Sequence, residues 1–182
     1  MDTDIRYNNT EYLVDKYLND VYRMAMVYVK DVDDAHDISQ QVFLTYIQKQ
    51  PHFNDEDHAK NWLMRVAVNL SKNHLRKNRD LISFDELEGV LTHTDTEYSG
   101  KSESDEAVFR AVMKLKSSYR EVIHLYYYEG YDTAEIAKII GVPASSVRSR
   151  LARARTALEK NLKGGKNELY GQLQKSDGPN KG

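Results

Sequence analysis

Apolar residues recur every three or four positions through most of the first eighty residues, and this spacing predicts helices. The run that begins at Glu11 is interrupted at 31–34, where Asp33 and Asp34 are expected to cap a second helix that Pro51 ends. A third helix is expected from about Ala59 to Lys77. The residues expected to face inward are Leu13, Tyr17, Val21, Met24, Val27 and Tyr28, then Ile38, Val42, Leu44, Tyr46 and Ile47, then Leu63, Val66, Ala67, Leu70 and His74 or Leu75. Residues 1–79 are therefore predicted to form one compact helical domain.

Periodicity fades over residues 80–104, which are rich in acids, Ser and Thr and are predicted to be a linker. The helical spacing returns from Asp105 to Glu129. Beyond Gly164, the segment 165–182 is rich in Gly, Asn and Lys and is predicted to be a disordered tail. The second domain is thus expected over 105–164.

Residues 131–158 predict two short helices that meet at a tight turn. Asp132 followed by Glu135 is typical of a capping box, and Gly141 supplies the left-handed residue that ends the first helix. Apolar residues then recur at steps of four, three and four in a second, far more basic helix. Such a pair is typical of a helix-turn-helix. The inward residues are expected to be Ile136, Ala137 and Ile140, then Val147, Leu151, Ala154 and Leu158.

The predicted fold class is all-α, with two small helical domains joined by a flexible acidic linker, the C-terminal one a helix-turn-helix. Of the 182 residues, 40% are hydrophobic and 30% charged, so a core can form in each domain. There is no cysteine, no apolar run of membrane-spanning length and no signal peptide at the start of the sequence. These features predict a cytoplasmic protein without direct membrane insertion.

The formal net charge of −2 conceals a strong asymmetry along the chain. Residues 80–106 contain nine acidic residues and one basic residue, whereas residues 107–163 contain eleven basic and five acidic ones. Four arginines lie within 148–155 with no acid among them. An ordinary solvated hairpin is the alternative, but a merely soluble surface mixes its signs, so the pattern favours DNA binding.

The third predicted helix carries a second basic stripe, opposite its apolar face. No acid occurs from Lys60 to Arg79, and the amide side chains among the basic residues can read base edges. A solvated face and a nucleic-acid contact are both compatible with this pattern. The stripe consists of Arg65, Asn69, Lys72, Asn73 and Arg76.

Nothing in the sequence indicates catalysis. The six histidines show no short metal-ligand spacing, and no phosphate-binding glycine loop is present. The acids between Asp31 and Asp37 lack the glycine and closing glutamate of an EF-hand. We therefore expect no enzyme activity, no metal site and no cofactor.

With both domains in view, the chain resembles the extracytoplasmic-function (ECF) sigma factors of the sigma-70 family, which direct bacterial RNA polymerase to promoters. DAHDISQQVFLTYI is similar to the segment that binds polymerase, and NWLMRVAVNLSKNHLRKNR is similar to the segment that melts promoters and reads the −10 element. The stretch from LKSSYREV to ARTAL is similar to the domain that reads the −35 element. The resemblance covers almost the whole chain.

The resemblance implies roles for individual residues. Those implied to bind polymerase are Asp37, Gln40 and Gln41, although the family usually has an acid in place of Gln41. Those implied to act at the −10 element and in melting are the loop from Phe53 to His58, with Asn61, Arg65, Asn69, Lys72, Asn73 and Arg76; Asn61 stands where larger members have an aromatic residue. Those assigned to the −35 major groove are Ser145, Arg148, Ser149, Ala152 and Arg153, with Arg150 and Arg155 directed toward phosphates.

The implied partners are core RNA polymerase, promoter DNA and an antagonist. The DNA is expected to be duplex at −35 and a single non-template strand at −10. The antagonist is an anti-sigma factor that could hold the protein at the membrane.

The acids from Asp85 to Glu97 are expected to lie in the polymerase's nucleic-acid path. The rival prediction is a stand-alone DNA-binding regulator in which residues 1–79 sense a signal or dimerise.

Overall fold

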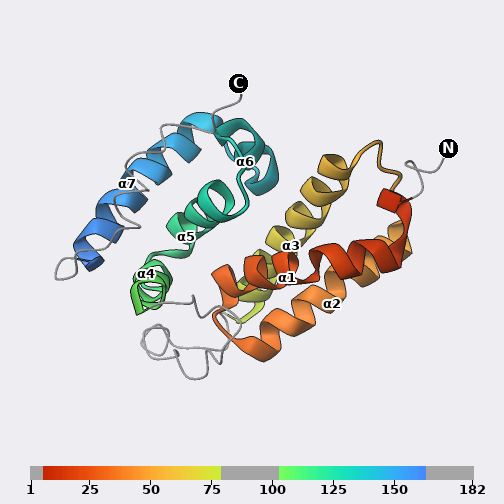
Figure 1. Ribbon diagram of the computed structural model, residues 1–182, viewed down its shortest axis with the longest axis horizontal. Coiled ribbons are helices and arrows are strands. Elements are labelled where there is room, and N and C mark those ends of the chain that lie inside the picture. Colours follow the sequence, from red (N-terminus) through yellow and green to blue (C-terminus); the bar gives the residue numbers. More distant parts are fainter. Residues whose placement is uncertain (1–5, 79–102, 163–182) are drawn as a thin grey trace. The chain divides into compact units, whose positions relative to one another are not determined.

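The computed structural model describes residues 6–78 and 103–162, and its regular elements in these ranges are all helical (Figure 1). The chain divides into two compact units, residues 1–91 and residues 92–182. This confirms the all-α fold class. The predicted tail and all but the last two residues of the predicted linker, including the acids from Asp85 to Glu97, lie outside the described residues.

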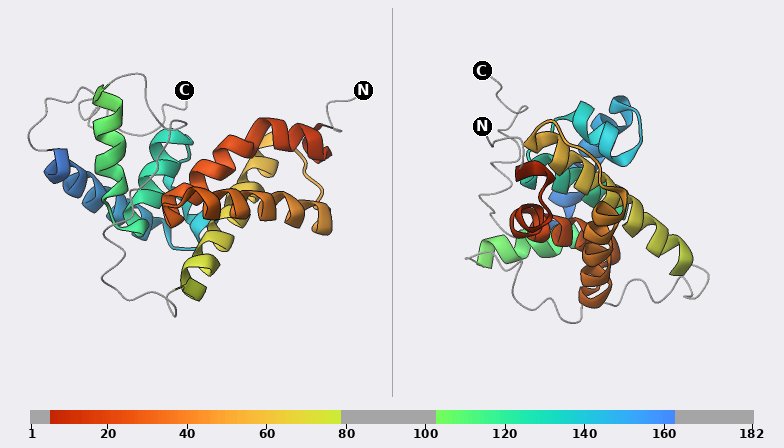
Figure 2. Two further views of the ribbon diagram at one scale, coloured as in Figure 1. Left: turned by 90° about the horizontal axis from the view of Figure 1, so that it is seen from below. Right: turned by 90° about the vertical axis from the view of Figure 1, so that its right-hand side faces the viewer.

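The first unit is built on three long helices, α1 (Thr10–Val29), α2 (Val32–Lys49) and α3 (Glu56–Asn78), preceded by the short 3₁₀ helix η1 (Arg6–Asn8). Helix α1 packs along both α2 and α3 (Figures 1 and 2). The side chains between the three helices are buried and apolar, as the helical spacing predicts. They include Leu13, Val21, Met24, Val42, Phe53, Leu63, Met64, Ala67 and Val68.

Several details of the first unit differ from the sequence-based prediction. Asp31, and neither Asp33 nor Asp34, is the N-cap of α2, because the Asp31 carboxylate accepts a hydrogen bond from the Asp34 amide at 2.9 Å. Helix α3 begins at Glu56, three residues earlier than expected. The inward face is also rotated: Met64 and Val68 are buried, whereas Val66 and Leu70 are half-buried and Leu44 and Ile47 are each 48% exposed.

A polar contact joins α1 to the first residue of α3. The Tyr17 hydroxyl donates to Glu56 Oε1 at 2.8 Å, and the Lys16 ammonium forms an ion pair with the same carboxylate. Burial raises the pKa of the Tyr17 phenol to about 12, and the charges of Tyr12, Asp20 and Asp57 act in the same direction. The start of α3 is therefore fixed against α1.

The second unit contains α4 (Glu103–Met113), α5 (Ser117–Ile123), the π-helix η3 (His124–Tyr128), α6 (Thr133–Ile140) and α7 (Ala144–Leu162). The helical spacing predicted from Asp105 to Glu129 is divided between separate helices, because the chain turns at residues 114–116. The buried Arg120 guanidinium explains the turn. It donates to the carbonyl groups of Met113 and Leu115, which a continuing helix would have used itself.

Candidate nucleic-acid and polymerase interfaces

The turn between α6 and α7 has the geometry that its sequence predicts. Asp132 accepts hydrogen bonds from the amides of Ala134 and Glu135, while the Glu135 carboxylate accepts one from the Asp132 amide at 2.8 Å, so the capping box is complete. Gly141 adopts φ 74° and its amide donates to the Ala137 carbonyl. Residues 141–143 therefore form a short connection between the two helices.

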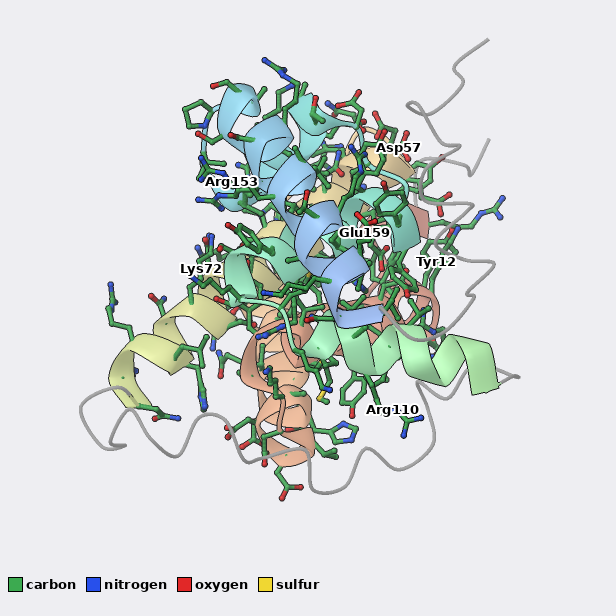
Figure 3. The ribbon with its side chains drawn as sticks, turned by 90° about the vertical axis from the view of Figure 1, so that its left-hand side faces the viewer. Tyr12, Asp57, Lys72, Arg110, Arg153 and Glu159 are labelled. Carbon is green, nitrogen blue, oxygen red and sulfur yellow. The ribbon has the colours of Figure 1, made fainter. Side chains whose placement is uncertain are left out.

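The buried stripe of α7 fixes which side of the helix faces solvent. Val147, Leu151, Ala154 and Leu158 are all buried, as predicted. The opposite side carries small polar residues and arginines, and Arg153 extends away from the helix (Figure 3). Its exposed members in the first half of α7 are Ser145, Arg148, Ser149, Ala152 and Arg153. We call these five residues the α7 face.

Arg150 and Arg155 are engaged by their own unit. The Arg150 guanidinium donates to Glu121 Oε1 at 2.6 Å, and the Glu121 side chain is 2% exposed. Arg155 Nε donates to the Tyr127 hydroxyl at 2.7 Å, and its guanidinium lies over the rings of Tyr126 and Tyr127. These partners lie almost thirty residues away in the chain, so sequence reasoning placed both arginines among the DNA contacts and missed their role in joining α7 to α5 and η3.

Helix α3 presents its basic stripe to solvent over about five turns. Asn61 and Lys72 are half-buried, and the Lys72 ammonium lies 6.0 Å from the centre of the Tyr28 ring. Lys72 projects from α3 in Figure 3. The exposed members are His58, Arg65, Asn69, Asn73 and Arg76. These seven residues form the α3 stripe, and no acid lies between Lys60 and Asn78 to oppose its charge.

Phe53 is placed differently from the expectation that it meets DNA. Its side chain is fully buried, and its ring lies 5.9 Å from that of Tyr46, 5.8 Å from that of Trp62 and 5.3 Å from that of His58, centre to centre. An aromatic side chain with no exposed surface cannot stack on a base in this conformation. Phe53 anchors the loop between α2 and α3 from within, and the exposed residues of the loop are its neighbours.

The residues expected to bind polymerase are exposed together on α2. Asp37, Gln40 and Gln41 recur at helical spacing, and Leu44 and Ile47 continue the same exposed surface. The sequence assigned Leu44 and Ile47 to the core because they are apolar. Two large aliphatic side chains, each about half exposed and three residues apart, are a signal of a contact surface. We call these five residues the α2 face.

Comparison with known proteins agrees with this arrangement. Residues 13–80 match the model of sigma-70 region 2, and residues 105–158 match that of sigma-70 region 4. The ECF RNA polymerase sigma-E factor of Haemophilus influenzae is 32% identical over 162 residues, which cover 82% of this chain and 85% of that protein. The chain belongs to the ECF sigma factors. This ECF sigma factor is a promoter-specific initiation factor of RNA polymerase. The family to which it belongs is one of transcription factors rather than of enzymes.

Further likenesses extend over a similar share of the chain. RNA polymerase sigma-H factor of Pseudomonas aeruginosa is 30% identical over 162 residues, 82% of this chain and 84% of that one. Among solved structures, the sigma factor RpoE of Bartonella quintana, in complex with the anti-sigma factor NepR, has a TM-score of 0.68 at 23% identity and covers 86% of this chain and 98% of that one. CnrH, in complex with the cytosolic domain of CnrY, has a TM-score of 0.59 at 23% identity, with coverage of 85% and 87%. The structural likenesses show a shared fold.

Metal sites and membrane-spanning helices are both absent from the part of the chain that the structure describes. No three His, Cys, Asp or Glu side chains in ranges 6–78 and 103–162 gather as they would around a metal ion. Among those same residues, no helix combines the length and the apolar character that crossing a membrane requires.

Proposed function

We propose that this ECF sigma factor reads two promoter elements while bound to core RNA polymerase, with the α7 face in the major groove of the −35 duplex. The observation that carries the proposal is the α7 face itself. Five exposed residues lie opposite a continuous buried stripe, on the second helix of a helix-turn-helix. Arg148 and Arg153 supply the charge and the bidentate hydrogen bonds that suit guanine or phosphate, and small Ser and Ala side chains let the helix approach the bases.

Arg150 and Arg155 have a different part in this proposal. Glu121 binds the guanidinium group of Arg150, and Tyr127 binds that of Arg155. The two arginines therefore set the rotation of α7 on the second unit and do not contact phosphates. A recognition helix with a fixed rotation presents its contact residues in one register. The two arginines therefore support the α7 face from its flanks.

The α3 stripe and the exposed part of the loop around Phe53 form the proposed −10 surface. Reading a single strand requires positive charge along the backbone and polar groups that can bind an unstacked base. Arg65, Lys72 and Arg76 supply the charge, whereas Asn69 and Asn73 supply amides. Phe53 contributes by holding the loop in place.

The α2 face is the proposed contact with core polymerase. Its two exposed aliphatic residues lie beside polar residues, which is the composition of a protein–protein contact with an apolar centre and a polar rim. Because RpoE was solved in complex with the anti-sigma factor NepR, we also propose that an anti-sigma factor masks this chain. A sigma factor meets polymerase in the cytoplasm, and a membrane-anchored antagonist would hold it at the membrane.

Run-off transcription with core polymerase on genomic fragments tests the proposal. The full chain should add promoter-specific transcripts, and Arg153→Ala should weaken them by about tenfold or more, as expected when one major-groove interaction is removed. Arg110→Ala removes the same charge from an exposed site on α4 and should leave transcription unchanged. If the chain alone binds operator DNA tightly and adds no transcript with core polymerase, the protein is instead a stand-alone regulator.

A further inference from the structure

The side-chain amide of Asn8 pairs with both backbone hydrogen-bonding groups of Phe53. Asn8 Oδ1 accepts from the Phe53 amide at 2.8 Å, and Asn8 Nδ2 donates to the Phe53 carbonyl at 3.2 Å. The two residues are 45 positions apart, and the contact joins η1 to the loop between α2 and α3, which meet at one end of the unit (Figure 1). We call this contact the Asn8 clamp.

The clamp acts on the residue that already anchors the loop. The Phe53 ring is fully buried among the rings of Tyr46, Trp62 and His58, so packing in the core fixes its side chain. The clamp fixes its backbone through the two hydrogen bonds to Asn8. With ring and backbone both held, the residues His52 and Asn54 on either side of Phe53, both exposed, have little freedom to change direction.

The far end of the same loop is also held by the start of the chain. Glu56, the first residue of α3, accepts from the Tyr17 hydroxyl and pairs with Lys16, both on α1. The Asp55 side chain accepts from the His58 amide at 2.7 Å and so caps the first turn of α3. The loop is thus tied to η1 at Phe53 and to α1 at Glu56.

We infer that Asn8 is a positioning residue for −10 specificity, an inference that rests on the proposed −10 role of this loop. A loop held in one conformation loses little entropy when a base binds, and it presents one set of polar groups to that base. Asn8 lies before residues 13–80, the stretch that matches sigma-70 region 2. The determinants of promoter choice therefore extend to residues that precede that match.

The chemistry of the clamp predicts which hydrogen bonds each substitution at Asn8 removes. The amide offers one acceptor and two donors, and the clamp uses both kinds. Asn8→Asp keeps the acceptor for the Phe53 amide but places a carboxylate against the Phe53 carbonyl, and Asn8→Ala removes both partners. Both should release the loop, and Asn8→Ala leaves the Phe53 backbone with neither of the two bonds.

The neighbouring asparagine supplies a matched control. Asn9 is the N-cap of α1, where its side chain accepts from the Tyr12 amide at 3.0 Å. Asn9→Ala makes the same chemical change one residue away and destabilises α1, without touching the loop. A change seen in both variants reports stability, whereas a change confined to Asn8 reports the clamp.

The experiment is transcription with core polymerase and the full chain on a promoter library randomised across the −10 and −35 elements. Asn8→Ala should lower the preference for the favoured −10 base by about fivefold and leave −35 preferences unchanged, and Asn9→Ala should leave both unchanged. Amide hydrogen exchange supplies a readout without DNA. Exchange at Phe53 should be about tenfold faster in Asn8→Ala than in the wild type or in Asn9→Ala.

The possible failures are distinct. If wild-type chain shows no −10 preference with core polymerase, the proposed function is wrong and this inference with it. If the wild type shows a preference that Asn8→Ala retains, or if Asn9→Ala weakens it equally, the inference alone is overturned. Faster exchange at Phe53 with an unchanged −10 preference likewise overturns it, since the clamp is then structural only.

Discussion

The pairing of Arg150 with buried Glu121 yields a prediction that separates support from DNA contact on one helix. We consider Arg150→Ala, with Arg153→Ala as the matched variant two residues beyond the buried Leu151. Both changes remove one guanidinium from α7. Of the two arginines, Arg150 has its charge within hydrogen-bonding distance of a carboxylate inside the unit, at 2.6 Å.

The expected loss of stability follows from burial. The Glu121 side chain is 2% exposed and that of Arg150 is 30% exposed, so removing Arg150 takes one positively charged partner from a carboxylate that water hardly reaches. Breaking a fully buried ion pair by removing one partner lowers the free energy of unfolding by about 3–5 kcal/mol. Because Arg150 is partly exposed, we expect a loss of about 2–4 kcal/mol for Arg150→Ala. Arg153→Ala, at an exposed site, should change the free energy of unfolding by less than about 0.5 kcal/mol. Replacing the pair together, as in Glu121→Leu with Arg150→Met, should restore most of the loss.

The chain carries a convenient probe for this measurement. Trp62 is the single tryptophan of the sequence and lies in the first unit. Urea unfolding of the full chain can therefore be followed by tryptophan fluorescence for the first unit and by far-ultraviolet circular dichroism for both. Arg150→Ala should move the dichroism transition of the second unit and leave the fluorescence transition in place.

For DNA binding, Arg153→Ala should have the larger effect and Arg150→Ala the smaller one, the reverse of their effects on stability. With core polymerase on a promoter duplex, Arg153→Ala should lower the slope of log affinity against log salt by about 0.9 for each phosphate that it no longer neutralises, whereas Arg150→Ala should leave that slope unchanged at temperatures where the unit is folded. If Arg150→Ala leaves stability unchanged and lowers the salt slope as much as Arg153→Ala, Arg150 is a phosphate ligand and the support role is wrong.

Three further changes test the first unit. Phe53→Ala should lower its free energy of unfolding by about 4 kcal/mol, seen in Trp62 fluorescence, because a fully buried ring leaves a cavity; a loss below about 1 kcal/mol would contradict the anchor role. Burial raises the pKa of Tyr17 to about 12, so the unfolded phenol loses its proton at a lower pH than the folded one; the free energy of unfolding should be level below about pH 10 and fall from there to about pH 12. Tyr17→Phe should flatten this fall, and an unchanged pH profile in the variant would exclude Tyr17 as the cause. Ile47→Glu on the α2 face should weaken core polymerase binding by about tenfold or more, while Leu18→Glu at a similarly exposed site on α1 should not; equal effects would contradict the proposed surface.

Much of the fold could be predicted from local signals. The spacing of Val147, Leu151, Ala154 and Leu158 and the pair Asp132 and Glu135 act within one or a few helical turns, and the structure confirms both. The details that the sequence did not predict lie where another helix intervenes. The break at residues 114–116 depends on Arg120 reaching back to the carbonyl groups at the end of α4, and the exposure of Leu44 and Ile47 depends on which side of α2 the other helices cover.

The sequence by itself determined the helices, the helix-turn-helix and the family, because periodicity, capping and motif order are properties of neighbouring residues. Only the tertiary structure decided which polar side chains are available to a partner. Sequence reasoning placed both Arg150 and Arg153 at the DNA, yet Arg150 meets a buried carboxylate from α5 and Arg153 meets solvent. The resemblance implies that Phe53 acts at the −10 element, yet its ring completes the core and its backbone is held by Asn8. The physical reason is that availability depends on contacts between residues far apart in the chain, and those contacts exist only once the helices have packed.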